Sequence, residues 1–341
     1  MDGSDTPADD VGDPSATLLA VVEAALEPLG SDWVERAAAV LPDLRAAVEA
    51  RATAAAELLD GHGVEAVARV PKSRLADLQR CERSARARYL HPDDRGPGRA
   101  ALRGVALDRF VLLAAQGSPL SAPTAELLSV LDAQGEEGLC DQVIEAVGED
   151  LAVFDDLVDP TEAWRDLPDE WWPRLQSAAT ASLAGGRIVC SGRLDAELGG
   201  PLVGRPGVVV EVKSGAPRQA HVEEVALYAL LVGWRDGVPP ALVVRWYPFH
   251  GAAVAPVDAG SLSSAAARLG DAVETWAQLL VGRTPSESPG PWCRWCPDAP
   301  TCPSAAPVQV SVGAPTSAGG PAELPEDDEV EWEPPDDGVG S

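Results

Sequence analysis

The spacing of apolar and polar residues changes once along this chain, near residue 187. Before that point, alanine- and leucine-rich stretches carry apolar residues at helical spacing, from about residue 17 to 59 and from about 73 to 151. Beyond it, β-branched runs bounded by glycine and proline predict strands at RIVCSGRLDAEL, GVVVEVKSG, ALVVRWYPF and GAAVAPVD. Helical spacing returns between the second and third of these runs and after the fourth. Helices alternating with strands indicate an α/β fold.

Finer signals predict the boundaries of these regions. The short run VEAVARVP predicts a strand before residue 72, and Ser73 predicts the N-cap of a helix that reaches about Leu90. The helical pattern is expected to continue through Trp171 and Trp172, an aromatic pair that predicts core or interface packing. We therefore expect an acidic leader at 1–14, a helical region at 15–70, a main domain at 71–304 with a helical insertion at about 117–186, and an acidic tail at 305–341.

Charge is distributed unevenly along the chain. The net charge is −28, yet residues 1–28 hold seven acidic and no basic side chains, and residues 305–341 hold nine and none. Such acidic ends predict disorder. Between Lys72 and Arg109, ten basic residues stand against five acidic ones, which fits either a phosphate backbone or a solvated, arginine-rich helix face. The acidic total therefore does not exclude a nucleic-acid partner.

The lengths of the apolar runs and the number of cysteines help to predict the cellular compartment of the protein. No run reaches the roughly 18 apolar residues of a membrane span, and the N-terminus lacks the pattern of a signal peptide. We expect a cytoplasmic protein with no membrane partner. In a reducing compartment the six cysteines are expected to be ligands or buried thiols rather than disulfides.

Charged residues cluster on two consecutive predicted strands. Glu211 and Lys213 are two residues apart, so their side chains project together, while Val210 and Val212 face the core. Asp195 ends the preceding strand, and a connector rich in glycine and proline returns the chain antiparallel beside it. The two carboxylates are therefore expected to converge on one point.

This arrangement suits a divalent metal. Two carboxylates and the Val212 carbonyl form a hard oxygen site for Mg²⁺ or Mn²⁺. Lys213 could hold a metal-bound water in line and stabilise charge that develops on a phosphate. The alternative is an ordinary ion pair on an exposed strand. Asp108, on a predicted helix, is a candidate third carboxylate, and His91 could instead supply an imidazole.

The helix after this strand carries two further candidates. Glu224 and Tyr228 are four residues apart and lie on one helical face, from which they can reach the rim of the site. The other interpretation is a surface glutamate and a half-buried tyrosine.

Cysteine spacing predicts a second site. Cys293 and Cys296 form C-x-x-C, and Cys302 follows after five residues. Cys81 is the candidate fourth ligand. Spacing leaves zinc and an iron–sulfur cluster open, although three clustered thiolates with one remote partner suit a [4Fe–4S] cluster that closes the domain. The remaining cysteines are expected to be buried thiols: Cys140 and Cys190.

Taken in order, these motifs resemble the RecB-like branch of the PD-(D/E)XK nucleases, and most closely its iron–sulfur members, the Cas4-like and AddB-type nucleases. The resemblance spans about residues 73–302. The motifs that carry it are Cys81, G-x-x-x-D at 104–108, G-x-x-D at 192–195, E-x-K at 211–213, Glu224 with Tyr228, and the cysteines at 293, 296 and 302. It implies a restriction-endonuclease-like core, in which a mixed sheet is flanked by helices, and a metal-dependent deoxyribonuclease.

The resemblance also implies roles for these residues. Asp108, Asp195 and Glu211 would bind the metal, and Lys213 would assist the attacking water. Tyr228, with Glu224, would line the DNA face. The ligands of a [4Fe–4S] cluster that joins the domain ends would be Cys81, Cys293, Cys296 and Cys302. The implied partners are single-stranded or end-containing DNA and a helicase or repair complex.

Two departures from the family pattern matter for function. The family usually has histidine at the position of Asp108 and glutamine at that of Glu224. Aspartate can bind Mg²⁺, whereas Glu224 adds negative charge where DNA must approach. We expect an exonuclease or flap-type enzyme acting on single strands in DNA repair or recombination. The alternatives are a catalytically inactive iron–sulfur DNA-binding or scaffold protein and a zinc-stapled interaction module.

Overall fold

The structure is a computed structural model of the chain, and it describes residues 18–30, 32–91, 164, 171–213, 215–247 and 250–305. Several sequence predictions lie outside these residues. They are Asp108, Cys140, the acidic leader and tail, and most of the predicted helical insertion.

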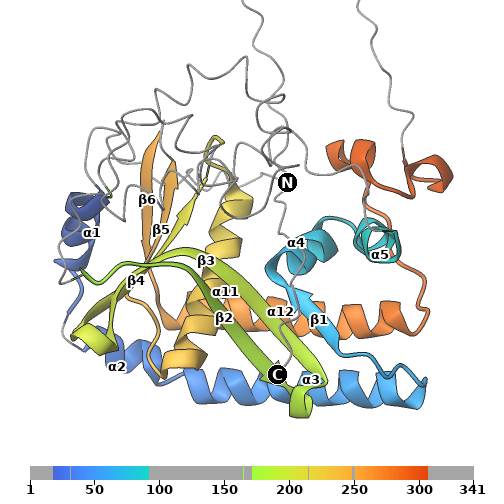
Figure 1. Cartoon of the computed structure of the whole chain (residues 1–341), viewed down its shortest axis with the longest axis horizontal. Coiled ribbons are helices and arrows are strands. Elements are labelled where there is room, and N and C mark those ends of the chain that lie inside the picture. The colour runs from blue at the N-terminus through green and yellow to red at the C-terminus, as the bar shows by residue number, and fades with distance from the viewer. Residues whose placement is uncertain are drawn as a thin grey trace, which may run out of the picture.

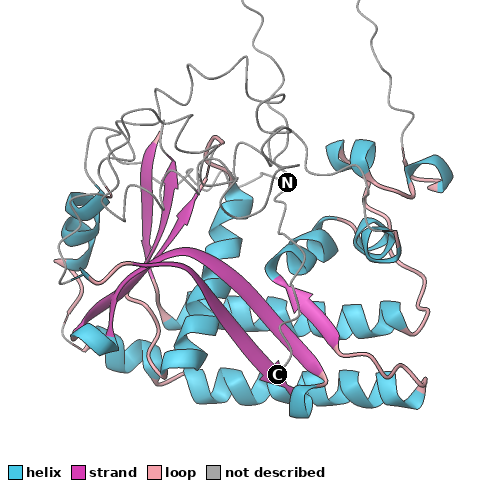
Figure 2. Ribbon diagram, viewed as in Figure 1, coloured by secondary structure: helices cyan, strands magenta, loops and turns pink. Residues whose placement is uncertain are grey.

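β-branched runs from the second half of the chain supply most of the sheet. Its strands are β1 (Ala68–Pro71), β2 (Arg174–Leu183), β3 (Ile188–Gly200), β4 (Arg205–Val212), β5 (Leu242–Tyr247) and β6 (Gly251–Pro256). The order is β1-β3-β4-β5-β6, and β2 also pairs with β3. β1/β3 and β4/β5 are parallel, and the other pairs are antiparallel. The fold is therefore α/β, with a mixed sheet flanked by helices (Figure 2).

The long strand β3 has three partners, and this positions the candidate site. One edge of β3 carries β2, while the other edge carries β1 along Ile188–Ser191 and β4 from Ala196 onward. Residues 192–195 lie between those two partners. Because β1 runs parallel and β4 antiparallel to β3, the C-terminal ends of β1 and β4 point toward each other across this gap.

Helices cover the sheet and pack on one another (Figure 1). They are α1 (Leu18–Leu26), α2 (Trp33–Ala38), α3 (Leu41–Gly61), α4 (Lys72–Arg80), α5 (Glu82–Leu90), α11 (Gln219–Asp236) and α12 (Ala259–Leu280), with short 3₁₀ turns at 184–186, 201–203, 291–295 and 299–301. α12 starts at a capping box formed by Asp258 and Ser261. None of the described helices is both long and apolar enough to cross a membrane.

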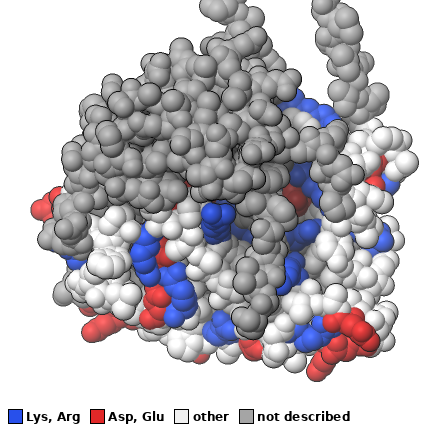
Figure 3. Space-filling view, in the orientation of Figure 1, with Lys and Arg blue, Asp and Glu red and all other residues white. Residues whose placement is uncertain are grey.

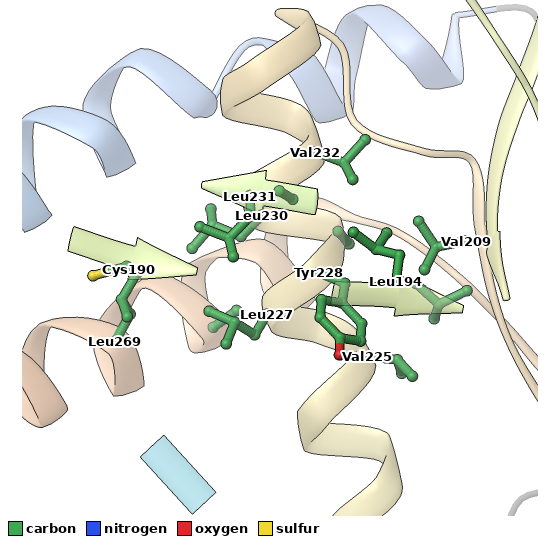
Figure 4. Close-up of a cluster of buried hydrophobic side chains, with 14 of the residues drawn as sticks. Cys190, Leu194, Val209, Val225, Leu227, Tyr228, Leu230, Leu231, Val232 and Leu269 are labelled. Carbon is green, nitrogen blue, oxygen red and sulfur yellow. The ribbon is translucent and has the colours of Figure 1, made fainter. Parts of the chain in front are cut away.

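One hydrophobic core joins the helices to the sheet. Figure 4 shows its centre, where Tyr228 of α11 lies beside Leu194 of β3 and Val225. The N-terminal helices share this core, since Leu59 is fully buried in it. Trp33 also donates from Nε1 to the carbonyl of Val257, at 3.0 Å. The region 15–70 thus packs directly on the main domain.

Two local predictions were wrong, and a third is confirmed in part. The helix expected from Ser73 begins at Lys72 without a side-chain cap, and it breaks at Cys81, which adopts extended backbone angles between α4 and α5. Residues 174–183, expected to be helical, form β2, because their pairing with β3 overrides a pattern rich in alanine. Of the tryptophan pair, only Trp171 is buried, while Trp172 is 60% exposed.

Candidate active site and cysteine pocket

The register of β3 explains how the predicted carboxylates meet. The β3–β4 ladder ends at the pair Ala196 and Val210, so the next residues, Asp195 and Glu211, stand at the gap. There the Val212 amide donates to Asp195 Oδ2 at 2.7 Å. The Asp195 carboxylate thus replaces a ladder partner and is fixed beside the E-x-K segment. The predicted antiparallel pairing is confirmed, and the convergence of the two carboxylates on one metal stays a prediction.

Lys213 joins Glu211 to the following helix. Its Nζ lies 3.0 Å from Glu211 Oε1 and 2.9 Å from Glu224 Oε2. Glu211 and Lys213 are both buried, with 1% and 6% exposure. The contact with Glu224 is an ion pair without hydrogen-bond geometry, since Glu224 Oε2 accepts no hydrogen bond within the described part of the chain. The prediction that Glu224 reaches the site is confirmed, and the exposed-strand alternative for E-x-K does not apply.

Lys72 is a site residue that the sequence analysis missed. It was counted in a basic surface stretch, but it is 2% exposed and donates to Glu211 Oε1 at 2.9 Å. Its Nζ also lies 3.8 Å from Glu224 Oε2. The parallel β1–β3 register brings it here, because Pro71 pairs with Ser191 and the next residue reaches the gap. A signal was present in the sequence, since lysine occurs at only two positions, 72 and 213.

Tyr228 packs against Lys72 and hydrogen-bonds to β3. Its hydroxyl donates to the Arg193 carbonyl at 2.7 Å, and its ring centroid lies 5.1 Å from Lys72 Nζ. A Cβ at Gly192 would collide with this ring, so glycine is what allows the ring to approach β3. Tyr228 is 1% exposed. It therefore frames the site from within the core, which differs from the expectation that it lines a DNA face.

β5 adds polar groups that the sequence analysis did not single out. Arg245 is the register partner of Glu211 in the β4–β5 ladder and is 2% exposed. Tyr247 Oη lies 3.0 Å from Nδ1 of the buried His221, on the first turn of α11. Burial raises the pKa of Tyr247, although the nearby Arg245 and Lys213 oppose that shift. Arg245 and Tyr247 were missed because every residue of β5 is buried, so the strand shows no alternation of polar and apolar positions that would single them out.

The donor set fits a divalent cation in part. Glu211 Oε2 is buried and has no hydrogen-bond partner among the described residues, which leaves one carboxylate oxygen available beside Asp195. Within those residues, no group of three or more histidine, cysteine, aspartate or glutamate side chains is placed to hold one metal ion. The predicted third carboxylate, Asp108, lies outside them. His91 is exposed at the end of α5.

The four predicted cluster ligands line one narrow pocket. Cys81, at the break between α4 and α5, faces the loop that carries Cys293, Cys296 and Cys302. The five cysteines within the described residues are free thiols in this structure. An iron–sulfur cluster carries its four ligands on separate irons, whereas a zinc site draws them to one ion. The four cysteines share one pocket, and the choice between zinc and an iron–sulfur cluster stays a prediction.

Polar contacts close this pocket. Arg83, on α5, binds Glu287 at 2.6 Å and Asp298 at 3.2 Å, so it joins the helix to the C-terminal loop. Hydrogen bonds from Ser304 and Arg83 hold the pKa of Glu287 below its ordinary value. The Gly290 amide donates to Cys293 Sγ at 3.4 Å. This contact fixes the position of the Cys293 side chain at the pocket.

Cys190 behaves as predicted for a buried thiol. It lies in β3 with 1% exposure, away from the other cysteines, and burial raises the pKa of its thiol to about 12.

In the basic stretch that starts at Lys72, most of the described lysine and arginine side chains contact other residues of the protein. The Arg74 guanidinium lies 4.1 Å from the Trp276 ring centroid, and burial lowers the pKa of that arginine. Arg88 pairs with Asp77 at 3.7 Å. On the face shown in Figure 3, lysine and arginine are interspersed with acidic and uncharged residues. Fewer basic side chains than expected are therefore accessible to a phosphate backbone in this part of the stretch. Its part beyond residue 91 lies outside the described residues.

Comparisons with known proteins add little. No protein-family model and no curated protein matches the chain. One solved structure that resembles it, titled "Crystal structure of SSO0001", is 16% identical and covers 53% of this chain and 82% of its own, with a TM-score of 0.30. A likeness at that level carries no argument about fold or function.

Proposed function

We propose that this protein is a divalent-metal-dependent deoxyribonuclease with a restriction-endonuclease-like core and a structural [4Fe–4S] cluster. The observation that carries the proposal is the meeting of Asp195, Glu211 and Lys213 at the gap on β3. Two carboxylates that can hold a divalent metal, with an ammonium beside one of them, suit metal-assisted phosphodiester hydrolysis.

Each residue has a distinct part in this proposal. Asp195 and the unpartnered oxygen of Glu211 would hold the metal, with the Val212 carbonyl and Asp108 completing the set. A bound Mg²⁺ or Mn²⁺ would supply a Lewis acid that lowers the pKa of water. The Lys213 ammonium would orient that water and stabilise charge on the phosphate oxygens.

The proposed substrate is DNA that offers a single strand or an end. Phosphodiesters carry the negative charge that Lys213 and the metal would meet, and the proposed reaction is hydrolysis of the backbone. A helicase or repair-complex partner that delivers such DNA belongs to the same proposal, with the helical region 15–70 as its candidate contact.

The cluster would join segments far apart in sequence. Cys81 and the loop at 293–302 line one pocket, and Arg83 bridges the same two segments. A cluster there would fix α5 against the C-terminal loop and so hold the start and the end of the main domain together.

One observation favours a second candidate. Glu211 Oε1 is already bound by two lysines, so the ligand carboxylate is neutralised without a metal. A catalytically inactive iron–sulfur DNA-binding or scaffold protein of the same fold would have this property.

A cleavage assay separates the two candidates. Protein purified anaerobically is incubated with end-labelled single- and double-stranded DNA and Mn²⁺, as wild type and as Lys213→Met. The control Arg36→Met removes a cation whose side chain is 62% exposed on α2. We expect cleavage by wild type and control, and a loss of about 100-fold or more in Lys213→Met. Intact, cluster-loaded protein that binds but never cleaves either DNA would favour the inactive candidate.

The cofactor has its own test. We expect wild type to contain roughly four irons per chain with broad visible absorption. Cys81→Ala should lose both, while Cys190→Ala, which alters a thiol outside the pocket, should keep them. A colourless protein that contains zinc would instead favour the zinc-stapled module.

A further inference from the structure

The chain has two lysines, and both form an ion pair with the Glu211 carboxylate. Of 26 lysines and arginines, only Lys72 and Lys213 are lysine. Both are buried, and their Nζ atoms lie 2.9 Å and 3.0 Å from Glu211 Oε1. Arginine supplies the positive charge at every other position. A lysine ammonium is a compact point charge, whereas guanidinium is a planar fork, so lysine is retained where two cations must share one oxygen.

Glu224 balances this pair of cations. Its Oε2 lies 2.9 Å from Lys213 Nζ and 3.8 Å from Lys72 Nζ. Lysines 72 and 213 and glutamates 211 and 224 thus form a cluster, here called the four-charge cluster, with no net charge. Because an unpaired buried charge is strongly destabilising, the pairing of two ammonium groups with two carboxylates allows both lysines to be buried here.

The position of Lys72 is otherwise unfavourable. It is the first residue of α4, where the positive end of the helix dipole opposes a cation. It is also nearly inaccessible to water. The carboxylates of the cluster, together with the Tyr228 ring, offset both costs. Contacts with the site, rather than local helix preference, account for a lysine here.

We propose that Lys72 restrains the candidate active site: balanced by Glu224, it holds Glu211 in an ion pair and lowers the affinity of the site for a divalent cation. This inference rests on the proposed function, since it takes Asp195 and Glu211 as the metal ligands. An incoming divalent cation competes with the two ammonium groups for Glu211. Glu224 weakens that competition because it draws the same ammonium groups toward itself.

The test is a set of Mn²⁺ titrations by calorimetry, without DNA, on the full chain purified anaerobically. Lys72→Met removes a competing cation, so we expect Mn²⁺ to bind about tenfold tighter or more. Glu224→Gln removes the carboxylate that shares the two ammonium groups with Glu211, so we expect Mn²⁺ to bind about tenfold more weakly. The double variant restores the charge balance and should lie within about threefold of wild type.

A spectroscopic readout follows the lysines directly. Protein labelled with ¹³C at lysine Cε should give two lysine signals, because the chain has two lysines. Lys72→Arg assigns them. We expect Glu211→Gln to shift both signals without metal, and Mg²⁺ to shift both in wild type. The visible spectrum and the melting temperature show that each variant is folded; if Lys72→Met alone does not fold, Glu224→Gln and the double variant still provide the comparison.

The outcomes separate the inference from the proposed function. Wild type that cleaves DNA, together with Lys72→Met of unchanged Mn²⁺ affinity, would overturn the inference and leave the nuclease proposal standing. A double variant as weak as Glu224→Gln would also overturn it. Absence of Mn²⁺ binding and of the Mg²⁺-induced shift in wild type would reject the proposed function, and the inference with it.

Discussion

At the scale of single residues, the site depends on small differences in shape. Gly192 leaves room for the Tyr228 ring, and the ring in turn lies beside Lys72. Asp195 is fixed by one hydrogen bond from the Val212 amide. A side chain one carbon larger at residue 192 would push on the ring and, through it, on the four-charge cluster.

Gly192→Ala should therefore destabilise the protein. Because the new methyl group would meet the Tyr228 ring in a packed core, we expect the free energy of unfolding to fall by about 1–3 kcal/mol. Anaerobic urea denaturation measures this change. Gly61→Ala is the matched control, since nothing lies within 4 Å of a Cβ there, and we expect it to be neutral or slightly stabilising at the end of α3. Equal effects of the two substitutions would contradict the packing argument.

Cys190 offers a second residue-scale prediction. Burial raises the pKa of its thiol to about 12, so at pH 8 little thiolate forms and access is closed. Iodoacetamide should leave Cys190 unmodified in the folded protein and modify it after denaturation in urea. Peptide mass spectrometry would reveal this, and rapid labelling of Cys190 in folded protein would show that β3 is open there.

At the scale of elements, an ion-pair clasp joins two helices far apart in sequence. Arg51 of α3 binds Glu274 of α12 with two hydrogen bonds of 2.7 Å, and it also contacts Asp271. The hydrogen bonds from Arg51 hold the pKa of Glu274 below its ordinary value of 4.5. A depressed carboxylate pKa means that the stabilisation is complete above 4.5 and is lost as the pH falls through the folded pKa.

Arg51→Met should consequently destabilise the protein in a pH-dependent way. Both carboxylates are partly exposed, so we expect a loss of about 1 kcal/mol or less at pH 7. The difference from wild type should shrink below pH 4.5. Melting curves of both proteins between pH 3 and pH 7 measure it, with Arg36→Met as the control for an exposed helix pair. A difference that does not depend on pH would assign the effect to packing of the arginine stem.

At the scale of the whole molecule, the cysteine pocket closes a long loop of chain. Cys81 and Cys302 line the same pocket although 220 residues separate them in sequence. Arg83 adds protein contacts across the same boundary. The longer the loop that a link closes, the more conformational entropy it removes from the unfolded chain. A cluster at this pocket would thus stabilise the closure of the main domain.

Loss of the proposed cluster should open this boundary first. After oxidative removal of iron, we expect faster amide hydrogen exchange in α5 and in residues 286–305, while α3 and α12 remain protected by the shared core. Hydrogen exchange with mass spectrometry, on iron-loaded and iron-free protein, would detect the change. Uniform loss of protection would instead mean that iron supports the entire fold.

Local sequence patterns were enough to predict most of the elements and the residue pairs that lie close along the chain. β-branched runs bounded by glycine and proline predicted β3 to β6, and the E-x-K spacing placed Glu211 beside Lys213, because side-chain direction in a strand depends only on local geometry. The C-x-x-C loop was visible for the same reason. Cys81, the candidate fourth ligand, was inferred from chain order and the need for four thiolates, and it lines the same pocket.

Local patterns did not reveal which distant residues share the site, because that depends on long-range strand pairing. Lys72 looked like one cation in a basic stretch, and its place against Glu211 follows from the parallel pairing of β1 with β3. The strand at 174–183 likewise pairs with β3, and the alternation of Ala179, Ala181 and Leu183 with polar residues is a short strand signal that its alanine content concealed. Long-range pairing and burial depend on the whole fold, so they fixed what local periodicity could not: which lysine is buried, and which carboxylates face it.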